Sequence, residues 1–126
     1  MKSEEIKSLL FEFREKLKLL KSILIQKQTA ILEFDYEMLE DIIESEELLL
    51  KEIASIRGKF DFSGDTLKVF IETDVQLKSL RDEVDQEIEI IKRLNNEVRY
   101  LITHSLLFVR KLLDLYHGQN KINTRI

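Results

Sequence analysis

Residues that commonly carry enzyme or metal chemistry are few in this chain of 126 residues, which has two histidines and no cysteine. His104 and His117 are thirteen positions apart, so on a helix they point about 140° apart and cannot bind one ion together. The acid-x-x-His spacing of di-iron bundles occurs once, at Asp114 and His117, where the helical pattern ends. The sequence has neither a glycine-rich phosphate loop nor a nucleophile motif. We therefore expect no enzyme activity and no catalytic, metal or cofactor-binding residues.

Carboxylates are abundant, but their placement favours a structural role. Two clusters are typical of solvated helix faces: Glu44 with Glu46 and Glu47, and Asp82 with Glu83 and Asp85. Glu46 and Glu87 differ from the rest because they fall on otherwise apolar rows. A carboxylate at such a position either fixes helix register and partner choice, or extends along its own stem to water. Of these two interpretations we favour the second.

The element that must carry any functional residues is one long helix. From Asp65 to Tyr116 there is no glycine or proline, and apolar residues recur at alternating steps of four and three. The two rows are Phe70, Leu77, Val84, Ile91, Val98, Ser105, Leu112 and Thr73, Leu80, Glu87, Leu94, Leu101, Phe108, Leu115. This spacing is typical of a helix packed along a seam. A helix of this length extends roughly 75 to 80 Å.

Two shorter helices are predicted before it, at about 3–33 and 36–57. Ser3 is a suitable cap for the first, and Asp35 for the second. Phe34 and Leu39 have the spacing of a hydrophobic staple, which favours a break at 34–35 over one bent helix from 3 to 57. We expect Gly58 to end the second helix, a loop over 58–64, a third helix over about 64–117 and a flexible tail at 118–126.

These elements predict an all-α protein with a single domain over residues 1–126. Short connections make neighbouring helices antiparallel, so we expect a helical hairpin within a three-helix, coiled-coil-like bundle that has one long C-terminal helix. The net charge is −4, with about −6 over 34–57 and +3 over 95–126. No dense basic stripe suits nucleic acid, and no apolar run could serve as a signal peptide or span a membrane. We expect a cytoplasmic protein.

The apolar face widens in the last part of the long helix, and the first two helices are too short to cover all of it. This face either forms intramolecular core or accepts an amphipathic helix from another molecule. In the second interpretation, the partner-binding residues are Leu101, Ile102, Ser105, Leu106, Phe108, Val109, Leu112, Leu113 and Tyr116. An uncovered face of this size is costly in water, so we expect self-association, a partner or the chain folding back to cover it.

Two stretches of this helical, proline-free chain have further features in common with known proteins. The hairpin ILEFDYEMLEDIIESEELLLKEIASIR breaks at an acidic residue and ends in an arginine. The stretch RLNNEVRYLITHSLLFVRKLLDLY has a Leu-Asn pair before a long amphipathic run. Together they resemble FlgN-type flagellar export chaperones, whose signature is Leu-Asn-x-x-Asn-x-x-Leu-Leu followed by an amphipathic run. The matching positions are Leu94, Asn95, Leu101 and Ile102. Val98 replaces the second asparagine of the signature, and Arg99 stands where glycine is common.

The resemblance implies a cytoplasmic type III export chaperone that binds the C-terminal helical segments of hook–filament junction proteins and keeps them export-competent. It places the substrate face on the apolar run from Leu101 to Tyr116. Further partners in this interpretation are the export gate, the export ATPase and a second copy in a homodimer. The alternatives are a structural coiled-coil module that dimerises or spaces other proteins, and a FliT-type flagellar chaperone. The asparagine signature argues against the FliT type.

Overall fold

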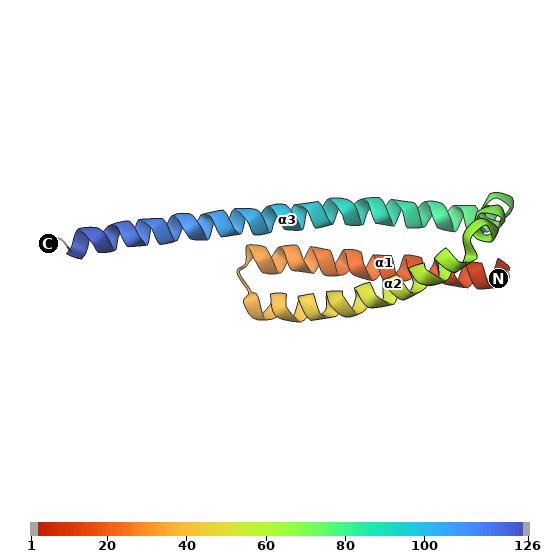
Figure 1. Ribbon diagram of the computed structural model, residues 1–126, viewed down its shortest axis with the longest axis horizontal. Helices are drawn as coiled ribbons and strands as arrows, with labels where there is room; N and C mark the ends of the chain where they lie inside the picture. The colour runs from red at the N-terminus through yellow and green to blue at the C-terminus, as the bar shows by residue number, and fades with distance from the viewer. Residues whose placement is uncertain (1–2, 125–126) are drawn as a thin grey trace.

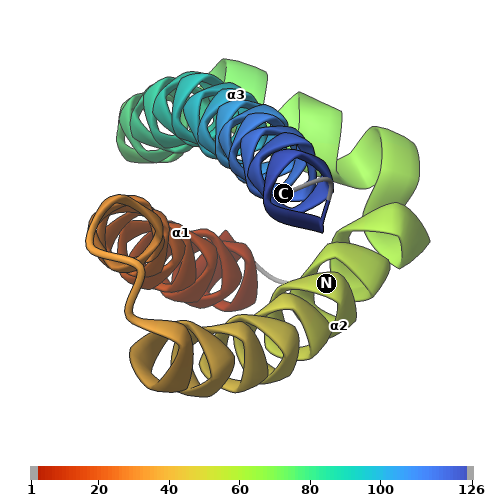
Figure 2. The same ribbon diagram turned by 90° about the vertical axis from the view of Figure 1, so that its left-hand side faces the viewer.

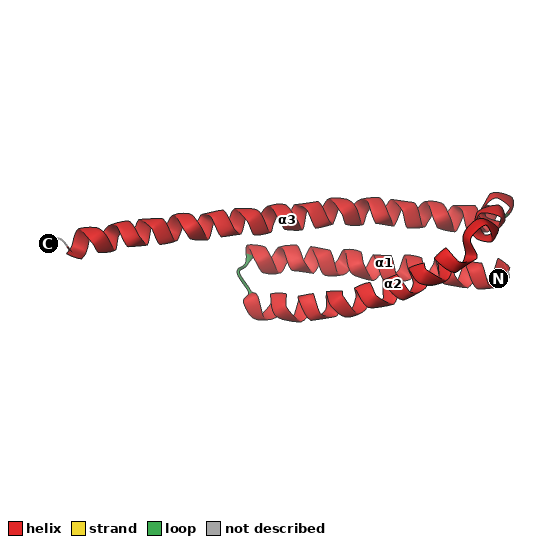
Figure 3. Cartoon of the chain, in the orientation of Figure 1, coloured by secondary structure: helices red, strands yellow, loops and turns green. Residues whose placement is uncertain are grey.

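A computed structural model describes residues 3–124, and side chains at 61–67, 70 and 118–124 lie outside the description. The described chain consists of α1 (Ser3–Leu32), α2 (Tyr36–Thr73) and α3 (Val75–Thr124), with no strand (Figures 1 and 3). The prediction of an all-α bundle with a long C-terminal helix is therefore confirmed. The first helix begins and ends within one residue of its predicted bounds.

The break between α1 and α2 lies where the sequence predicts it. Phe34 has a φ of 55°, a left-handed conformation that reverses the chain after Leu32. The Asp35 carboxylate accepts a hydrogen bond from the backbone N–H of Met38 at 3.1 Å, which caps the start of α2. One continuous bent helix from 3 to 57 is therefore wrong.

The predicted loop at 58–64 is wrong, because α2 continues through Gly58 to Thr73 and α3 begins at Val75 instead of residue 64. Two described side chains in the extension pack against the first helix. Phe60 meets the ring of Phe13 with 5.8 Å between centroids, and Ile71 is buried in the core. This packing stabilises a helix across residues whose local preference is for a turn.

Asp74 makes the second break. Its carboxylate accepts hydrogen bonds from the backbone N–H groups of Gln76 at 2.9 Å and Leu77 at 3.4 Å, and lies 3.3 Å from the ammonium of Lys7. Partial desolvation raises the pKa of Asp74, but these hydrogen bonds outweigh it and hold that pKa below its ordinary value. The carboxylate thus remains ionised and caps α3.

The predicted end of the long helix also needs correction. The helix continues beyond 117 to Thr124, so residues 118–124 are helical and not a tail. The last part of the predicted flexible tail, residues 125–126, lies outside the described residues.

The first helix lies between the other two. It packs extensively against α2 and α3, whereas α2 and α3 have few contacts with each other (Figures 1 and 2). Consecutive helices run antiparallel, as predicted, so α1 and α3 run parallel. Two clusters of buried side chains fill the interior. The first comprises Ile6, Leu10, Leu17, Ile71, Leu77 and Val84, and the second comprises Leu20, Leu24, Ile31, Leu49, Leu94 and Val98.

A polar row at seven-residue spacing on α1 faces α3. Its members and their partners are Lys7 with Asp74, Arg14 with Glu83, Lys21 with Glu87 and Gln28 with Glu97. The hydrogen bond from Arg14 to Glu83 raises the pKa of that guanidinium above its ordinary value. Partners along the row differ by 66–69 in residue number, so one parallel register holds along the whole of α1.

Glu46 and Glu87 do not extend to water, which corrects the interpretation favoured from the sequence. Each side chain is largely covered and contacts a lysine of α1. Glu46 lies 3.0 Å from Lys27, and Glu87 lies 2.9 Å from Lys21. Both carboxylates therefore contact a neighbouring helix. These contacts support the other interpretation, in which a polar group on a seam fixes the register of the helices.

Candidate partner-binding face

Within the described part of the chain, no helix lies beside the last part of α3 (Figure 1). With a register offset of 66–69, Leu32 at the end of α1 lies opposite residues 98–101 of α3. About 35 Å of α3 therefore extends past the hairpin of α1 and α2 (Figure 1). This projecting segment, residues 102–124, contains most of the partner-binding residues predicted from the sequence.

Most of the predicted partner-binding residues are exposed. The exposed fraction is 59% for Leu106, 53% for Phe108 and 60% for Tyr116. Ile102, Val109, Leu112 and Leu113 are also exposed, so the intramolecular-core interpretation is wrong for these residues. Leu101 and Ser105 are only half-buried, and Leu101 packs against the second core cluster. Leu107 and Leu115 are exposed beside them, although they are not among the predicted residues.

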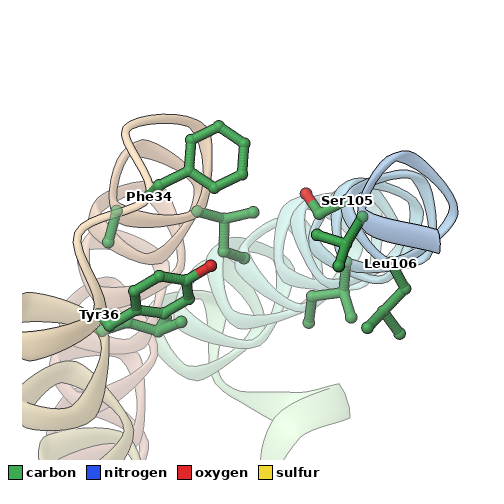
Figure 4. A pocket seen from close by; sticks show the side chains of 9 residues that line it. Phe34, Tyr36, Ser105 and Leu106 are labelled. Carbon is green, nitrogen blue, oxygen red and sulfur yellow. The ribbon is translucent and has the colours of Figure 1, made fainter. Parts of the chain in front are cut away.

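The base of the projecting segment meets the hairpin at a hollow of about 160 Å³. It is lined by Ala30, Ile31, Phe34, Tyr36 and Leu39 from the hairpin and by Ile102, Ser105, Leu106 and Val109 from α3. Figure 4 shows Phe34 and Tyr36 across the hollow from Ser105 and Leu106. The apolar surface is therefore continuous from the tip of the hairpin onto α3. The hairpin side of this surface was not predicted from the sequence, although Phe34 and Tyr36, two aromatic residues on either side of the Asp35 cap, could have indicated it.

The charges around this surface differ between the two elements. Arg99, Arg110 and Lys111 are exposed on α3, whereas the start of α2 has Glu37 and Glu40 exposed. The rings of Tyr100 and His104 lie 4.1 Å apart, next to Arg99 on the same helix. The described side chains thus form a surface that is apolar at its centre and carries charged residues along its edges.

Other kinds of site find little support in the described part of the chain. Among the residues whose side chains the structure describes, no three His, Cys, Asp or Glu side chains come together in a way that could hold a metal ion. Over the same residues, no helix is both long enough and apolar enough to cross a bilayer.

Comparison with known proteins agrees with the architecture. A search of curated proteins and a search of solved structures each gave no match. The sequence model described as "FlgN protein" matches residues 1–125, nearly the whole chain. With its helical hairpin and a long third helix that extends past it, this chain belongs to the FlgN family of flagellar export chaperones.

Proposed function

We propose that this protein acts in the cytoplasm as a flagellar type III export chaperone for hook–filament junction proteins. It binds their C-terminal helical segments and keeps them export-competent until they reach the export gate or the export ATPase. Family membership supports the general role and favours the FlgN type over the FliT type. The observation that carries the finer proposal is the exposed apolar face of α3 beyond the hairpin.

The binding residues in this proposal are those predicted from the sequence, from Leu101 to Tyr116. Large side chains such as Leu106 and Phe108 are more than half exposed, and contiguous apolar surface of this kind marks an interaction site. Covering roughly 600 Å² of it would contribute about 15 kcal/mol before the cost of ordering the partner. The partner's own apolar stripe is covered in the same step, which keeps the partner from associating with other subunits.

The test compares Phe108→Asp with a matched control, Phe11→Asp. Phe108 and Phe11 are exposed to 53% and 52%, but Phe11 lies on α1 away from the projecting segment, with its ring 4.8 Å from the guanidinium of Arg14. We expect Phe108→Asp to weaken binding of a peptide from the C-terminal helix of a hook–filament junction protein by more than tenfold, because it places a charge in an apolar contact. Phe11→Asp should bind like the wild type.

Circular dichroism and light scattering complete the experiment. Both variants should retain the wild-type helicity, since neither side chain is buried. Loss of folding in Phe108→Asp would mean that the face is core. A tight dimer that does not dissociate when the peptide is added would favour a structural coiled-coil module. Conversion of the dimer to a one-to-one complex of protein and peptide would support the export chaperone.

A further inference from the structure

A second apolar row faces the space between α2 and α3. Tyr36, Ile43 and Leu50 lie seven residues apart on α2, so they share one face of that helix. Tyr36 lines the hollow opposite Ile102 and Val109, which shows that this face points towards α3. All three side chains are exposed, Ile43 to 38% and Leu50 to 45%, because α2 and α3 have few contacts with each other.

The matching row of α3 consists of Ile88, Asn95, Ile102 and Val109, again seven residues apart. Ile88 is half-buried and packs with the first core cluster, together with Ile53 and Phe60 of α2. That cluster closes one end of the space. From there towards the hairpin both rows carry partly exposed apolar side chains, and the two rows end at the hollow, which Tyr36, Ile102 and Val109 line (Figure 4). We call the strip between the two rows the α2–α3 groove.

The two rims of the groove carry opposite charges. Glu40 and Glu47 follow Tyr36 and Ile43 by four residues and are exposed along the α2 rim. Lys92 and Arg99 follow Ile88 and Asn95 by four residues and are exposed along the α3 rim. Lys92 also lies 3.5 Å from Glu89, an exposed pair of the kind that exchanges readily for another partner. The groove is thus apolar at its centre, acidic on one side and basic on the other.

The charges on the two rims distinguish between the helices that could bind in the groove. The projecting α3 segment of a second copy has Arg110 on one flank of its apolar face and Lys111 on the other. It would place a cation against the α3 rim, where Lys92 and Arg99 repel it. A helix with one basic and one acidic flank matches both rims, and its charges also decide which way it runs.

We propose that the α2–α3 groove accepts an amphipathic helix of the export substrate as a fourth helix, with its cationic flank along α2 and its anionic flank along α3. This inference rests on the proposed function and extends its site from the projecting segment onto the hairpin. One substrate helix lies against Leu50, Ile43 and Tyr36 and continues along α3 towards Tyr116. The α2 rim then determines orientation as well as affinity.

The first test is a matched pair of variants, Leu50→Asp and Leu48→Asp. Leu50 faces the groove, whereas Leu48 is two positions away, about 160° around the helix, and is 64% exposed. We expect Leu50→Asp to weaken binding of the junction-protein peptide at least tenfold and Leu48→Asp to leave it within twofold, with equal helicity in both. Equal binding by the two variants, while Phe108→Asp weakens it, overturns the groove proposal and leaves the proposed function standing. If none of the three variants weakens binding, the proposed function fails as well.

The second test uses designed helical peptides of equal length with the same leucine stripe. One has a lysine flank and a glutamate flank, one has glutamate on both flanks and one has lysine on both. At low salt the mixed peptide should bind about tenfold more tightly than the others, since each exposed ion pair contributes about two- to fivefold, and high salt should remove the difference. The double variant Glu40→Lys/Glu47→Lys should prefer the peptide with glutamate on both flanks.

Two results would overturn the proposal. One is equal affinity of the three peptides at low salt. The other is a wild-type dimer in light scattering that Leu50→Asp converts to a monomer while the mixed peptide does not bind, because the groove would then be an interface between two copies of this chain.

Discussion

Leu94→Ala and Leu112→Ala make the same chemical change on one helix, in two environments. Leu94 is 6% exposed and belongs to the second core cluster, which α1, α2 and α3 form together. Leu112 is 50% exposed and lies on the segment that extends past the hairpin. If that segment is uncovered, the two substitutions must differ strongly in their effect on the free energy of unfolding.

The structure sets the expected magnitudes. Truncating a buried leucine removes its transfer free energy and leaves a cavity, which costs about 2–5 kcal/mol. We expect about 3 kcal/mol for Leu94→Ala, a large part of the roughly 5–15 kcal/mol that stabilises a domain. The covered half of Leu112 contacts its own helix, and alanine is the better helix former, so Leu112→Ala should change stability by less than about 0.5 kcal/mol.

Urea unfolding monitored by circular dichroism measures the free energy of unfolding of both variants. The dependence of that free energy on urea concentration should stay unchanged. The measurement should be repeated at two protein concentrations, since a dimer would make the midpoint depend on concentration. If Leu112→Ala destabilised the protein as much as Leu94→Ala, the projecting segment would be covered in solution. The face of α3 would then be unavailable to a partner, contrary to the proposed function.

Two further predictions concern the helices that hold this face in place. Gly58→Ala should stabilise the protein by about 0.5–1 kcal/mol, because a Cβ there meets nothing within 4 Å and the residue lies inside a helix; destabilisation in urea unfolding would indicate a turn. Lys27→Leu should destabilise by about 1–3 kcal/mol, since Glu46 loses the ammonium 3.0 Å away while remaining largely covered. The double variant Lys27→Leu/Glu46→Leu should recover most of that loss in the same assay.

The sequence predicted the first break because three local signals agree there. Asp35 caps, Phe34 and Leu39 have staple spacing, and the apolar pattern changes register across the break. The structure adds the left-handed φ of Phe34, which no residue pattern requires. Where capping chemistry and periodicity coincide, a boundary can be read without coordinates.

The second break could not be read in this way. Gly58 and the polar residues after it favour a turn locally, whereas Asp74 lies inside a continuing apolar pattern between Ile71 and Leu77. Tertiary packing decides the outcome, because Phe60 and Ile71 contact α1 only if the helix continues. The local preference of residues for a turn predicts structure poorly when buried contacts of this size favour a helix.

The projecting face was predicted from the helix lengths together with the widening apolar pattern in the last part of the third helix. Neither observation depends on the exact residue at which that helix begins. The groove on α2 was not predicted, because exposure of Tyr36, Ile43 and Leu50 depends on how far α2 and α3 separate. The same seven-residue spacing is equally typical of a row packed inside a bundle. Periodicity predicts that a face exists, while only the three-dimensional arrangement shows that no described part of the chain covers it.

The polar row between α1 and α3 links the stability of the fold to the size of the binding face. Apolar side chains alone tolerate a shift of one helix along another by seven residues, because the seam repeats at that interval. Such a shift would move α1 along α3 by about 10 Å, and would cover or expose two further turns of the projecting segment. Each contact that Lys7, Arg14, Lys21 and Gln28 make in the present register would then be broken, and another partner would have to replace it. These residues do not lie on the apolar face of residues 102–117, yet their contacts mark the register that sets where the exposed face of α3 begins.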